Sequence, residues 1–518
     1  MTAEFMENTP LELPHSPRHG ELFDLLVEGL TLDGMGVASV STLVGPQKQP
    51  LNYKFHIRKG LPGDRVRVQV ETRNKRVFLA HITEYLEPSK MRIEPRCRHF
   101  GRREIEGQGC GGCTFQSLSY RHQLMNKERL IKQQMIDHKV DPGLVYPMIG
   151  QEDPWYYRNK MEFSFGTTGE REFALGLYPK GYRYQVLNLK ECFLESEFTS
   201  NFLPKIKDWA MEMGLKPYRE GDQSGFLRNL SIREGKRTGE RMIELMTTHR
   251  PQAECGDKMV DATEIAQRFK AFILSEAPDD FTSIYWTQQY VERGERTRFI
   301  EHHLHGSPVL LEKMHLPGDQ ILSFEIHPRA FFQPNTRQAE VLYAEVLKHT
   351  GLLEGGAGAE EEEGAEKKRI LDLYCGTGTI GLCMAPFAEH VVGIELQPNA
   401  VDNARQNAHK NGIDNITFFA GDVGAVLKED AFIEAAGDID LVVVDPPRSG
   451  LLKEAREQLK AINPPRIIYV SCNPKTLARD LADLSASGYT IDRIQPVDMF
   501  PHTYHVENVA LLTRHEQA

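Results

Sequence analysis

The hydrophobic positions in the last third of the chain form short apolar runs that alternate with segments of helical character. Runs of this length, bounded by turn residues, are typical of buried strands in a parallel sheet. We expect strands at 370–373, 391–395, 417–420 and 441–444, with one helix ending near residue 388 and another at 399–411. This alternation predicts an α/β fold with a doubly wound, mostly parallel sheet within residues 326–518.

The first part of the chain has a different pattern. Residues 1–15 are polar and contain proline, which predicts a disordered tail. Between residues 16 and 86, turn signals separate short β-type runs at 22–30, 36–44, 65–71 and 77–85. Several short strands over this length predict a small β-barrel of the OB type, which frequently binds oligonucleotides.

Residues 87–325 predict a mixed α+β domain between these two regions. We expect a helix at 119–135, followed by short antiparallel strands separated by turns. Residues 354–368 are rich in Gly, Ala and Glu, which predicts a low-complexity surface insertion in front of the parallel sheet. A chain of 518 residues exceeds what one hydrophobic core usually organises, so several domains are expected.

Composition and charge narrow the class of partner. With 40% hydrophobic and 26% charged residues and no evident membrane span or signal peptide, the chain is expected in the cytoplasm, without a membrane partner. The net charge of -11 argues against nucleic acid, but much of the excess acid is concentrated in 354–366. The segment 54–76 holds eight Lys and Arg residues, which form either a basic face for phosphates or a solvated strand surface.

Four of the eight cysteines lie between residues 97 and 192. Two glycines separate Cys110 from Cys113, and this spacing lets both sulfurs reach one metal centre. Cys97 lies upstream and Cys192 downstream, so four thiolates are available to one site. Disulfides are uncommon in the cytosol, which leaves a metal site, a redox pair or packing, and the set of four favours the metal.

The turn after 370–373 indicates which nucleotide the sheet binds. It contains Gly376 and Gly378 but no third glycine at the spacing of dinucleotide-binding proteins. S-adenosylmethionine (SAM) has no pyrophosphate to cradle, so the turn favours SAM over NAD. We expect Asp372 to orient the turn and the methionine amine, Glu395 the ribose and Asp422 the adenine, unless these acids are solvated or capping residues.

Cys472 follows the apolar run 467–470, at the carboxyl end of an expected strand, where open α/β sheets bind ligands. From that position alone, the thiol could be reactive or could simply pack in the core. The neighbouring motifs favour a reactive role, because Asp445-Pro446-Pro447-Arg448 precedes the cysteine and His505-Val506-Glu507-Asn508 follows it.

The ordered motifs of this chain resemble those of the RNA 5-methyluridine (uracil-C5) methyltransferases. The matching motifs are Phe331-Phe332-Gln333-Pro334-Asn335, Leu373-Tyr374-Cys375-Gly376, Asp445-Pro446-Pro447-Arg448, Ser471-Cys472-Asn473-Pro474 and His505-Val506-Glu507-Asn508. Residues 33–38 and 60–64 are similar to a TRAM domain, an RNA-binding barrel. The barrel and the four cysteines point to the branch that acts on 23S rRNA, although the interval between Cys97 and Cys110 is longer than in that branch.

This resemblance implies a Rossmann-like, SAM-dependent methyltransferase domain that acts on uridine C5 in 23S rRNA, in a protein we expect to be a monomer. Cys472 is implied as the nucleophile that adds to C6, and Glu507 as the general base that takes the C5 proton. Phe331 would stack on the flipped base, and Asp445 would hold the uracil edge or the cofactor. The family's SAM contacts match Gln333, Tyr374, Thr379, Glu395, Asp422 and Asp445, beside the turn glycines Gly376 and Gly378. The family's 4Fe-4S cluster matches Cys97, Cys110, Cys113 and Cys192.

Three alternatives stay open. A tRNA-directed uridine methyltransferase is disfavoured because that branch generally lacks the barrel and the cluster. A cytosine C5 methyltransferase would normally show a Pro-Cys pair near its nucleophile. A non-catalytic RNA-binding iron–sulfur protein would have no use for both Cys472 and Glu507.

Overall fold

The computed structural model describes residues 11–13, 15–44, 46–101, 109–180, 184–292, 294–351 and 367–515. Its contacts divide the chain into two compact units. Unit 1 comprises Met1–Gly101, Gly112–Leu130 and Pro501–His505, and unit 2 comprises Arg102–Gly111, Ile131–Phe500 and Val506–Ala518. Most of the predicted insertion at 354–368 lies outside the described residues. Among those that are described, no helix is long and apolar enough to cross a membrane.

Unit 1 contains a seven-stranded, mostly antiparallel sheet. Its strands are β1 (Leu11–Leu13), β2 (Leu22–Leu26), β3 (Gly29–Leu30), β4 (Gly36–Val44), β5 (Gln49–Arg58), β6 (Arg65–Asn74) and β7 (Val77–Glu87). They pair in the order β1-β4-β5-β7-β6-β2, with β3 on β4. This path has two ends, so the described residues show the expected short strands but not a closed barrel. Helix α2 (Tyr120–Asp137), predicted at 119–135, begins in this unit.

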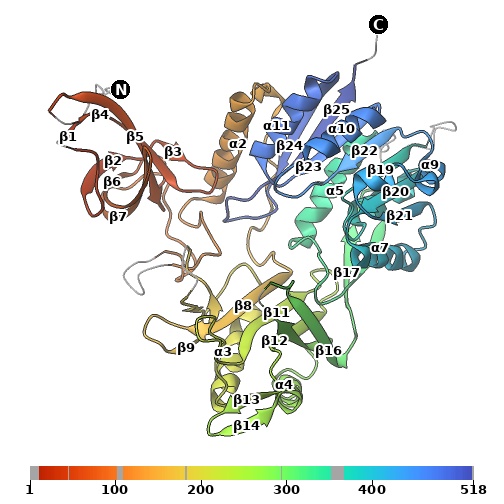
Figure 1. Ribbon diagram of the computed structural model, residues 1–518, viewed down its shortest axis with the longest axis horizontal. Helices are drawn as coiled ribbons and strands as arrows, with labels where there is room; N and C mark the ends of the chain where they lie inside the picture. Colours follow the sequence, from red (N-terminus) through yellow and green to blue (C-terminus); the bar gives the residue numbers. More distant parts are fainter. Residues whose placement is uncertain are drawn as a thin grey trace. The chain divides into compact units, whose positions relative to one another are not determined.

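The central part of unit 2 is a second seven-stranded sheet. Its strands pair in the order β10 (Leu187–Asn188), β9 (Phe173–Leu177), β8 (Lys160–Thr167), β11 (Leu227–Glu234), β12 (Arg241–Thr248), β15 (Ser283–Tyr290) and β16 (Arg298–Gly306). Only β12 and β15 run parallel. Helices α3 (Glu197–Glu212) and α4 (Ala262–Glu276) and the hairpin of β13 (Gln252–Cys255) and β14 (Lys258–Asp261) accompany the sheet (Figure 1). This arrangement confirms the predicted mixed α+β class.

The last part of unit 2 is the predicted α/β fold. Its strands pair in the order β21 (Ile416–Ala420), β20 (His390–Glu395), β19 (Arg369–Leu373), β22 (Leu441–Val444), β23 (Arg466–Ser471), β25 (Glu507–Arg514) and β24 (Tyr489–Val497). The pairs from β21 to β23 are parallel, whereas β25 is antiparallel to β23 and β24. The helices are α5 (Thr336–Thr350), α6 (Thr379–Met384), α7 (Pro398–Lys410), α8 (Val423–Val426), α9 (Asp430–Ala436), α10 (Lys453–Ile462) and α11 (Pro474–Ser485) (Figure 1).

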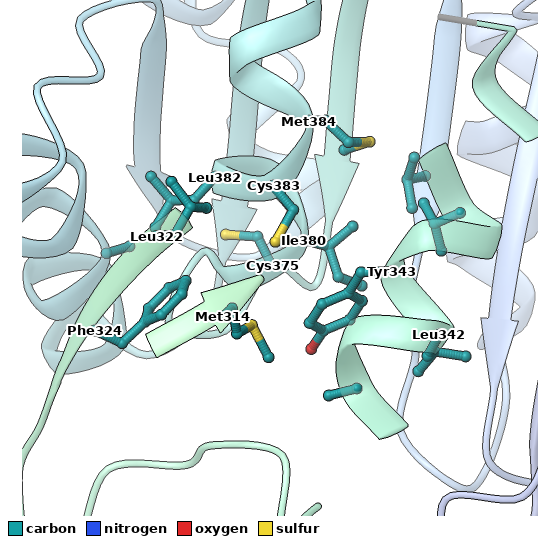
Figure 2. Packing of buried hydrophobic residues seen from close by; sticks show 14 of the residues in the cluster. Met314, Leu322, Phe324, Leu342, Tyr343, Cys375, Ile380, Leu382, Cys383 and Met384 are labelled. Carbon is teal, nitrogen blue, oxygen red and sulfur yellow. The ribbon is translucent and has the colours of Figure 1, made fainter. Parts of the chain in front are cut away.

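A hairpin joins the central sheet to the α/β fold within unit 2. It consists of β17 (Leu310–His315) and β18 (Ile321–Ile326). Met314 and Phe324 of the hairpin pack with Tyr343 of α5 and Cys383 of α6 in one buried hydrophobic cluster (Figure 2). The same cluster includes residues of the central sheet, so burial of apolar surface holds these two parts together.

Candidate active site

Two of the predicted site residues emerge side by side at the carboxyl edge of the parallel strands. Tyr374 directly follows β19, and Asp445 directly follows β22. Leu373 and Val444, the last residues of these strands, are register partners. The backbone N–H of Asp445 donates to the carbonyl of Leu373 at 3.3 Å, which continues the pairing past the strand ends. This edge is where open α/β sheets bind their ligands.

The antiparallel strand β25 brings the expected base to the expected nucleophile. Cys472 follows β23, whose last residue Ser471 pairs with Asn508. Because β25 runs opposite to β23, its first residue, Glu507, lies at the same edge of the sheet as Cys472. Residues more than thirty positions apart in the sequence are thereby placed together.

Asn473 fixes the turn that carries Cys472. Its side-chain Nδ2 donates to the carbonyl of Arg448 at 2.8 Å, and its Oδ1 accepts from the Lys475 N–H at 3.1 Å, which caps α11. Its own N–H donates to Ser471 Oγ at 3.2 Å. One side chain therefore joins the cysteine turn to the Asp445–Arg448 segment, which gives a physical reason for the asparagine in this motif.

The thiol of Cys472 is held in its protonated form at neutral pH. Burial and the neighbouring carboxylates of Glu507 and Asp445 raise its pKa to about 11, and Arg448 opposes this shift. Arg448 also acts against the raised pKa of Glu507. A positive charge brought in by a ligand would therefore favour the reactive thiolate.

Three carboxyl groups lie at or next to this edge: Asp372 and Glu507 are buried, and Asp445 is half-buried. Burial raises the pKa of Asp445 to about 7, and burial together with Asp445 raises the pKa of Asp372 to about 8. Glu507, which is 6% exposed, has a pKa well above its usual range because of burial and the charge of Asp445. Because burial disfavours each charged form and Asp445 disfavours ionisation of the other two acids, the group holds protons at a pH where isolated acids would release them.

The turn after β19 has the backbone geometry that its glycines suggest. Tyr374, Gly376 and Gly378 all have positive φ, at 64°, 56° and 75°. A Cβ on Gly378 would lie 2.8 Å from the ring of Phe418 and 2.9 Å from Ala404, so no side chain fits there. Gly378 directly precedes α6, whose first residue is Thr379.

The two acids expected to bind the nucleoside also bind backbone groups. Glu395 accepts from the N–H of Gly376 at 3.2 Å through Oε2 and from that of Gln397 at 2.9 Å through Oε1. Asp422 caps α8 by accepting from the N–H of Gly424 at 3.0 Å. Burial and Asp422 raise the pKa of Tyr374, which places the tyrosine near this acid. The capping role considered from the sequence is thus present, and it leaves Asp422 Oδ2 available to a ligand.

Phe331 and Gln333 reach the site from the segment that precedes α5. Phe331 is 68% exposed, as a residue that stacks on a base requires. The side chain of Gln333 hydrogen-bonds the hydroxyl of the buried Tyr343. Burial, Cys383, Asp445 and Glu507 raise the pKa of Tyr343. Tyr343 lies on α5 within the buried hydrophobic cluster (Figure 2). Nothing local in the sequence distinguishes it from other apolar positions of a helix, so it was not predicted.

The four candidate cluster cysteines are divided between the two units. Cys97 and Cys113 belong to unit 1, where Gln116 connects them: its Oε1 accepts from the Cys97 N–H at 3.1 Å and its Nε2 donates to Cys113 Sγ at 3.2 Å. Cys110 and Cys192 belong to unit 2. Within the described ranges, no three His, Cys, Asp or Glu side chains form a group that could hold a metal ion. The structure therefore does not support the predicted 4Fe-4S cluster.

Comparisons with known proteins agree on RNA methylation. A family described as tRNA (Uracil-5-)-methyltransferase matches residues 310–515. An uncharacterized RNA methyltransferase of Protochlamydia amoebophila is 36% identical over 88% of this chain and 98% of its own length. Another, from Caldanaerobacter subterraneus, is 35% identical over 96% of this chain and 99% of its own length.

A solved structure extends the similarity to the fold. The Pyrococcus abyssi tRNA (uracil-54, C5)-methyltransferase in complex with S-adenosyl-L-homocysteine superposes with a TM-score of 0.67 and is 25% identical. The match covers 95% of this chain and 99% of that chain, so it includes most of the strands described above.

Proposed function

Because this chain belongs to the RNA uracil-5-methyltransferase family, we propose that it methylates a uridine of 23S rRNA at C5 through a covalent adduct with Cys472. Membership makes it an enzyme that transfers a methyl group from SAM to RNA. The proposal includes 23S rRNA as the substrate, the roles of the individual residues, the division into four parts at 1–15, 16–86, 87–325 and 326–518, and a monomeric protein.

The observation that carries the mechanism is the pairing of Ser471 with Asn508. This pairing places a thiol and a buried carboxyl group, Cys472 and Glu507, next to each other at the ligand-binding edge of the sheet. Uracil C5 is a weak nucleophile, and a thiolate that adds to C6 shifts an electron pair onto C5. A second group must then remove the C5 proton before the thiol can leave.

Each step has a residue of this chain assigned to it. The Cys472 thiol releases its proton to solvent, its Sγ forms a bond to C6, and the electron pair of the C5–C6 double bond moves to C5. C5 gains the methyl group, which SAM supplies when bound. Glu507, in its ionised form, takes the C5 proton, the electron pair of the C5–H bond re-forms the C5–C6 double bond, and the bond between Sγ and C6 breaks with its electron pair returning to Sγ. Asp445 holds the uracil edge, and its raised pKa of about 7 allows it to donate as well as accept a hydrogen bond near neutral pH.

The residues at the first turn fit SAM. The left-handed backbone at Gly376 brings its N–H to Glu395, at the end of the neighbouring strand. Gln333, Tyr374, Gly378, Thr379, Asp422 and Asp445 complete the proposed set of SAM contacts. The test of this assignment is the affinity of the Glu395→Ala variant for SAM, measured by calorimetry. The variant is expected to bind SAM more weakly while it remains folded.

The Pyrococcus abyssi structure favours tRNA as a second candidate substrate. Its match over 95% of this chain extends into unit 1, so the strands there do not by themselves separate rRNA enzymes from tRNA enzymes. Mass mapping of 5-methyluridine in rRNA and tRNA from a deletion strain distinguishes the two. We expect one 23S rRNA site to lose its methyl group and tRNA to be unchanged. Loss from tRNA alone would contradict the rRNA assignment.

The iron–sulfur cluster stays a prediction from the four cysteines. Anaerobically purified protein is expected to contain iron and inorganic sulfide, and Cys110→Ser is expected to lose both. Stoichiometric zinc without sulfide would show that the cysteines bind zinc and not an iron–sulfur cluster. Absence of any metal would contradict the prediction of a metal site.

A further inference from the structure

The segment 327–335 carries two proposed site residues but has no regular secondary structure. It connects β18 to α5 and holds Phe331, for the base, and Gln333, for SAM. Outside helices and sheets, backbone carbonyls need other donors if they are to be held in one position. Two residues at the central sheet, Arg233 and Asn159, donate to four of its carbonyls, and Thr377 Oγ1 of the α/β fold donates to the carbonyl of Phe331 at 3.5 Å.

Arg233, on β11, donates to two carbonyls of the segment. Its Nε reaches Pro328 O at 3.2 Å and its Nη2 reaches Ala330 O at 2.5 Å. The arginine is 4% exposed, and burial lowers its pKa to about 10. Burying a guanidinium group costs free energy. Two of the N–H groups of Arg233 donate to neutral backbone carbonyls, so the interaction that Arg233 makes holds the segment in position.

Asn159 holds the other end of the segment. Its Nδ2 donates to Gln333 O at 2.7 Å and to Thr336 Oγ1 at 2.9 Å, and its N–H donates to Pro334 O at 2.9 Å. The asparagine is 5% exposed. It directly precedes β8, and its carbonyl accepts from the N–H of Glu234, the neighbour of Arg233. The two side chains thus project from the ends of paired strands.

We propose that Asn159 and Arg233 are positioning residues for methyl transfer: they fix the backbone from which Phe331 and Gln333 extend. The inference rests on the proposed function. The central sheet then has a role beyond supporting the α/β fold, because two of its residues determine the positions of the side chains that contact the target base and the methyl donor. Small misplacements of reacting groups cost large factors in rate.

The test compares each variant with a matched control in the full-length protein. Arg233→Lys keeps the charge but loses the fork, and its control is Arg228→Lys, on the same strand, where the guanidinium lies 3.9 Å over the Tyr218 ring. Asn159→Ala has as its control Asn229→Ala, whose side chain donates to Ser164. Either variant suffices if the other does not fold.

Two measurements are made on each folded variant. The first is single-turnover methyl transfer at saturating SAM and RNA, expected to fall about tenfold or more relative to the control. The second is limited chymotrypsin digestion, with cleavage after the exposed Phe331 expected to accelerate about tenfold because the segment opens locally. Melting temperatures should match those of the controls.

Unchanged digestion in a folded variant overturns the inference, as does normal methyl transfer in a variant whose segment digests faster. If the wild-type protein transfers no methyl group to uridine, the proposed function is contradicted and the positioning inference is not. In that case the digestion alone still decides whether Arg233 and Asn159 hold the segment.

Discussion

Cys472 and its acidic neighbours compete for protons in a site largely withdrawn from water. The thiol pKa of about 11 follows first from burial, then from Glu507 and Asp445. The protonated thiol is a poor nucleophile, so before the substrates bind Cys472 is protected from reaction with other electrophiles. In the proposed mechanism, the positive charge of bound SAM favours formation of the thiolate.

Replacing Glu507 with glutamine is expected to lower the pKa of Cys472. The amide keeps the shape of the side chain but removes the negative charge that disfavours the thiolate. The measurement is the rate of alkylation of Cys472 against pH, followed by mass spectrometry of its peptide. Glu429→Gln, at an exposed position, serves as the control and should leave the profile unchanged. An unaltered profile in Glu507→Gln would mean that the two groups do not interact.

Asp372 is expected to make the protein less stable as pH rises. Its pKa is about 8 in the fold, against an ordinary value near 4 in the unfolded chain, so the folded state binds the extra proton between these values. Stability is therefore greatest at the acid end of this window and falls toward pH 8. Asp372→Asn should remove a pH-dependent loss in the free energy of unfolding of about a few kcal/mol at most, and so flatten the dependence of the melting temperature on pH. An equal slope in both proteins would contradict the raised pKa.

At the scale of elements, the glycine turn shows how much depends on one backbone conformation. Gly376 and Gly378 both have positive φ, but only Gly378 has neighbours where a Cβ would lie. Gly376→Ala should therefore cost about 1 kcal/mol, from the left-handed backbone alone. Gly378→Ala should cost about 1–3 kcal/mol more because Phe418 and Ala404 must move. Equal melting temperatures for the two variants would show that the turn relaxes freely.

The elements that the sequence predicted are those whose pattern is local. Strands β19, β20 and β22 are largely buried on both faces, so apolar residues dominate them. Strand β5 was missed because Pro50 and Lys54 interrupt it, although Tyr53, Phe55 and Ile57 alternate into the core. Strand β25 was noticed only for its Glu507 motif.

The residues of the candidate site that belong to sequence motifs could be predicted. The residues that join the site only through tertiary packing could not. The sequence indicated Cys472, Asp445 and Glu507 as a group, and the sheet places them at one edge. Tyr343 and Arg233 carry no local signal, because each acquires a role only when a distant segment packs against it. The cysteine spacing gave a clear prediction that the described residues do not support.

At the scale of the whole molecule, RNA binding must overcome a net charge of -11. In unit 1, several arginines already have carboxylate partners, as in Arg58 with Glu71 at 3.1 Å and Arg67 with Asp24 at 2.8 Å. Lys54 and Arg76 are exposed, make no ion pair among the described residues and lie together, since the Lys54 N–H donates to Arg76 O at 3.0 Å. These two are the better candidates for phosphate contacts.

The double variant Lys54→Gln, Arg76→Gln should weaken RNA binding and leave SAM affinity intact. If each residue contacts a phosphate, the slope of log K against log salt should fall by about 0.7 per contact. Arg58→Gln, Arg67→Gln removes the same charge from the same sheet and should have a smaller effect, because these cations are already paired. Equal losses in the two double variants would mean that only total charge matters.

In the proposed mechanism Cys472 forms the adduct and Glu507 acts afterwards, and one gel tests this order. Glu507→Gln is incubated with substrate RNA and methyl-labelled SAM, then run under denaturing conditions. We predict a slow-migrating, labelled protein–RNA species, because the thiol adds and the methyl group is transferred but the C5 proton cannot leave. The Cys472→Ala, Glu507→Gln double variant should show none. Normal turnover by Glu507→Gln without an adduct would contradict the account.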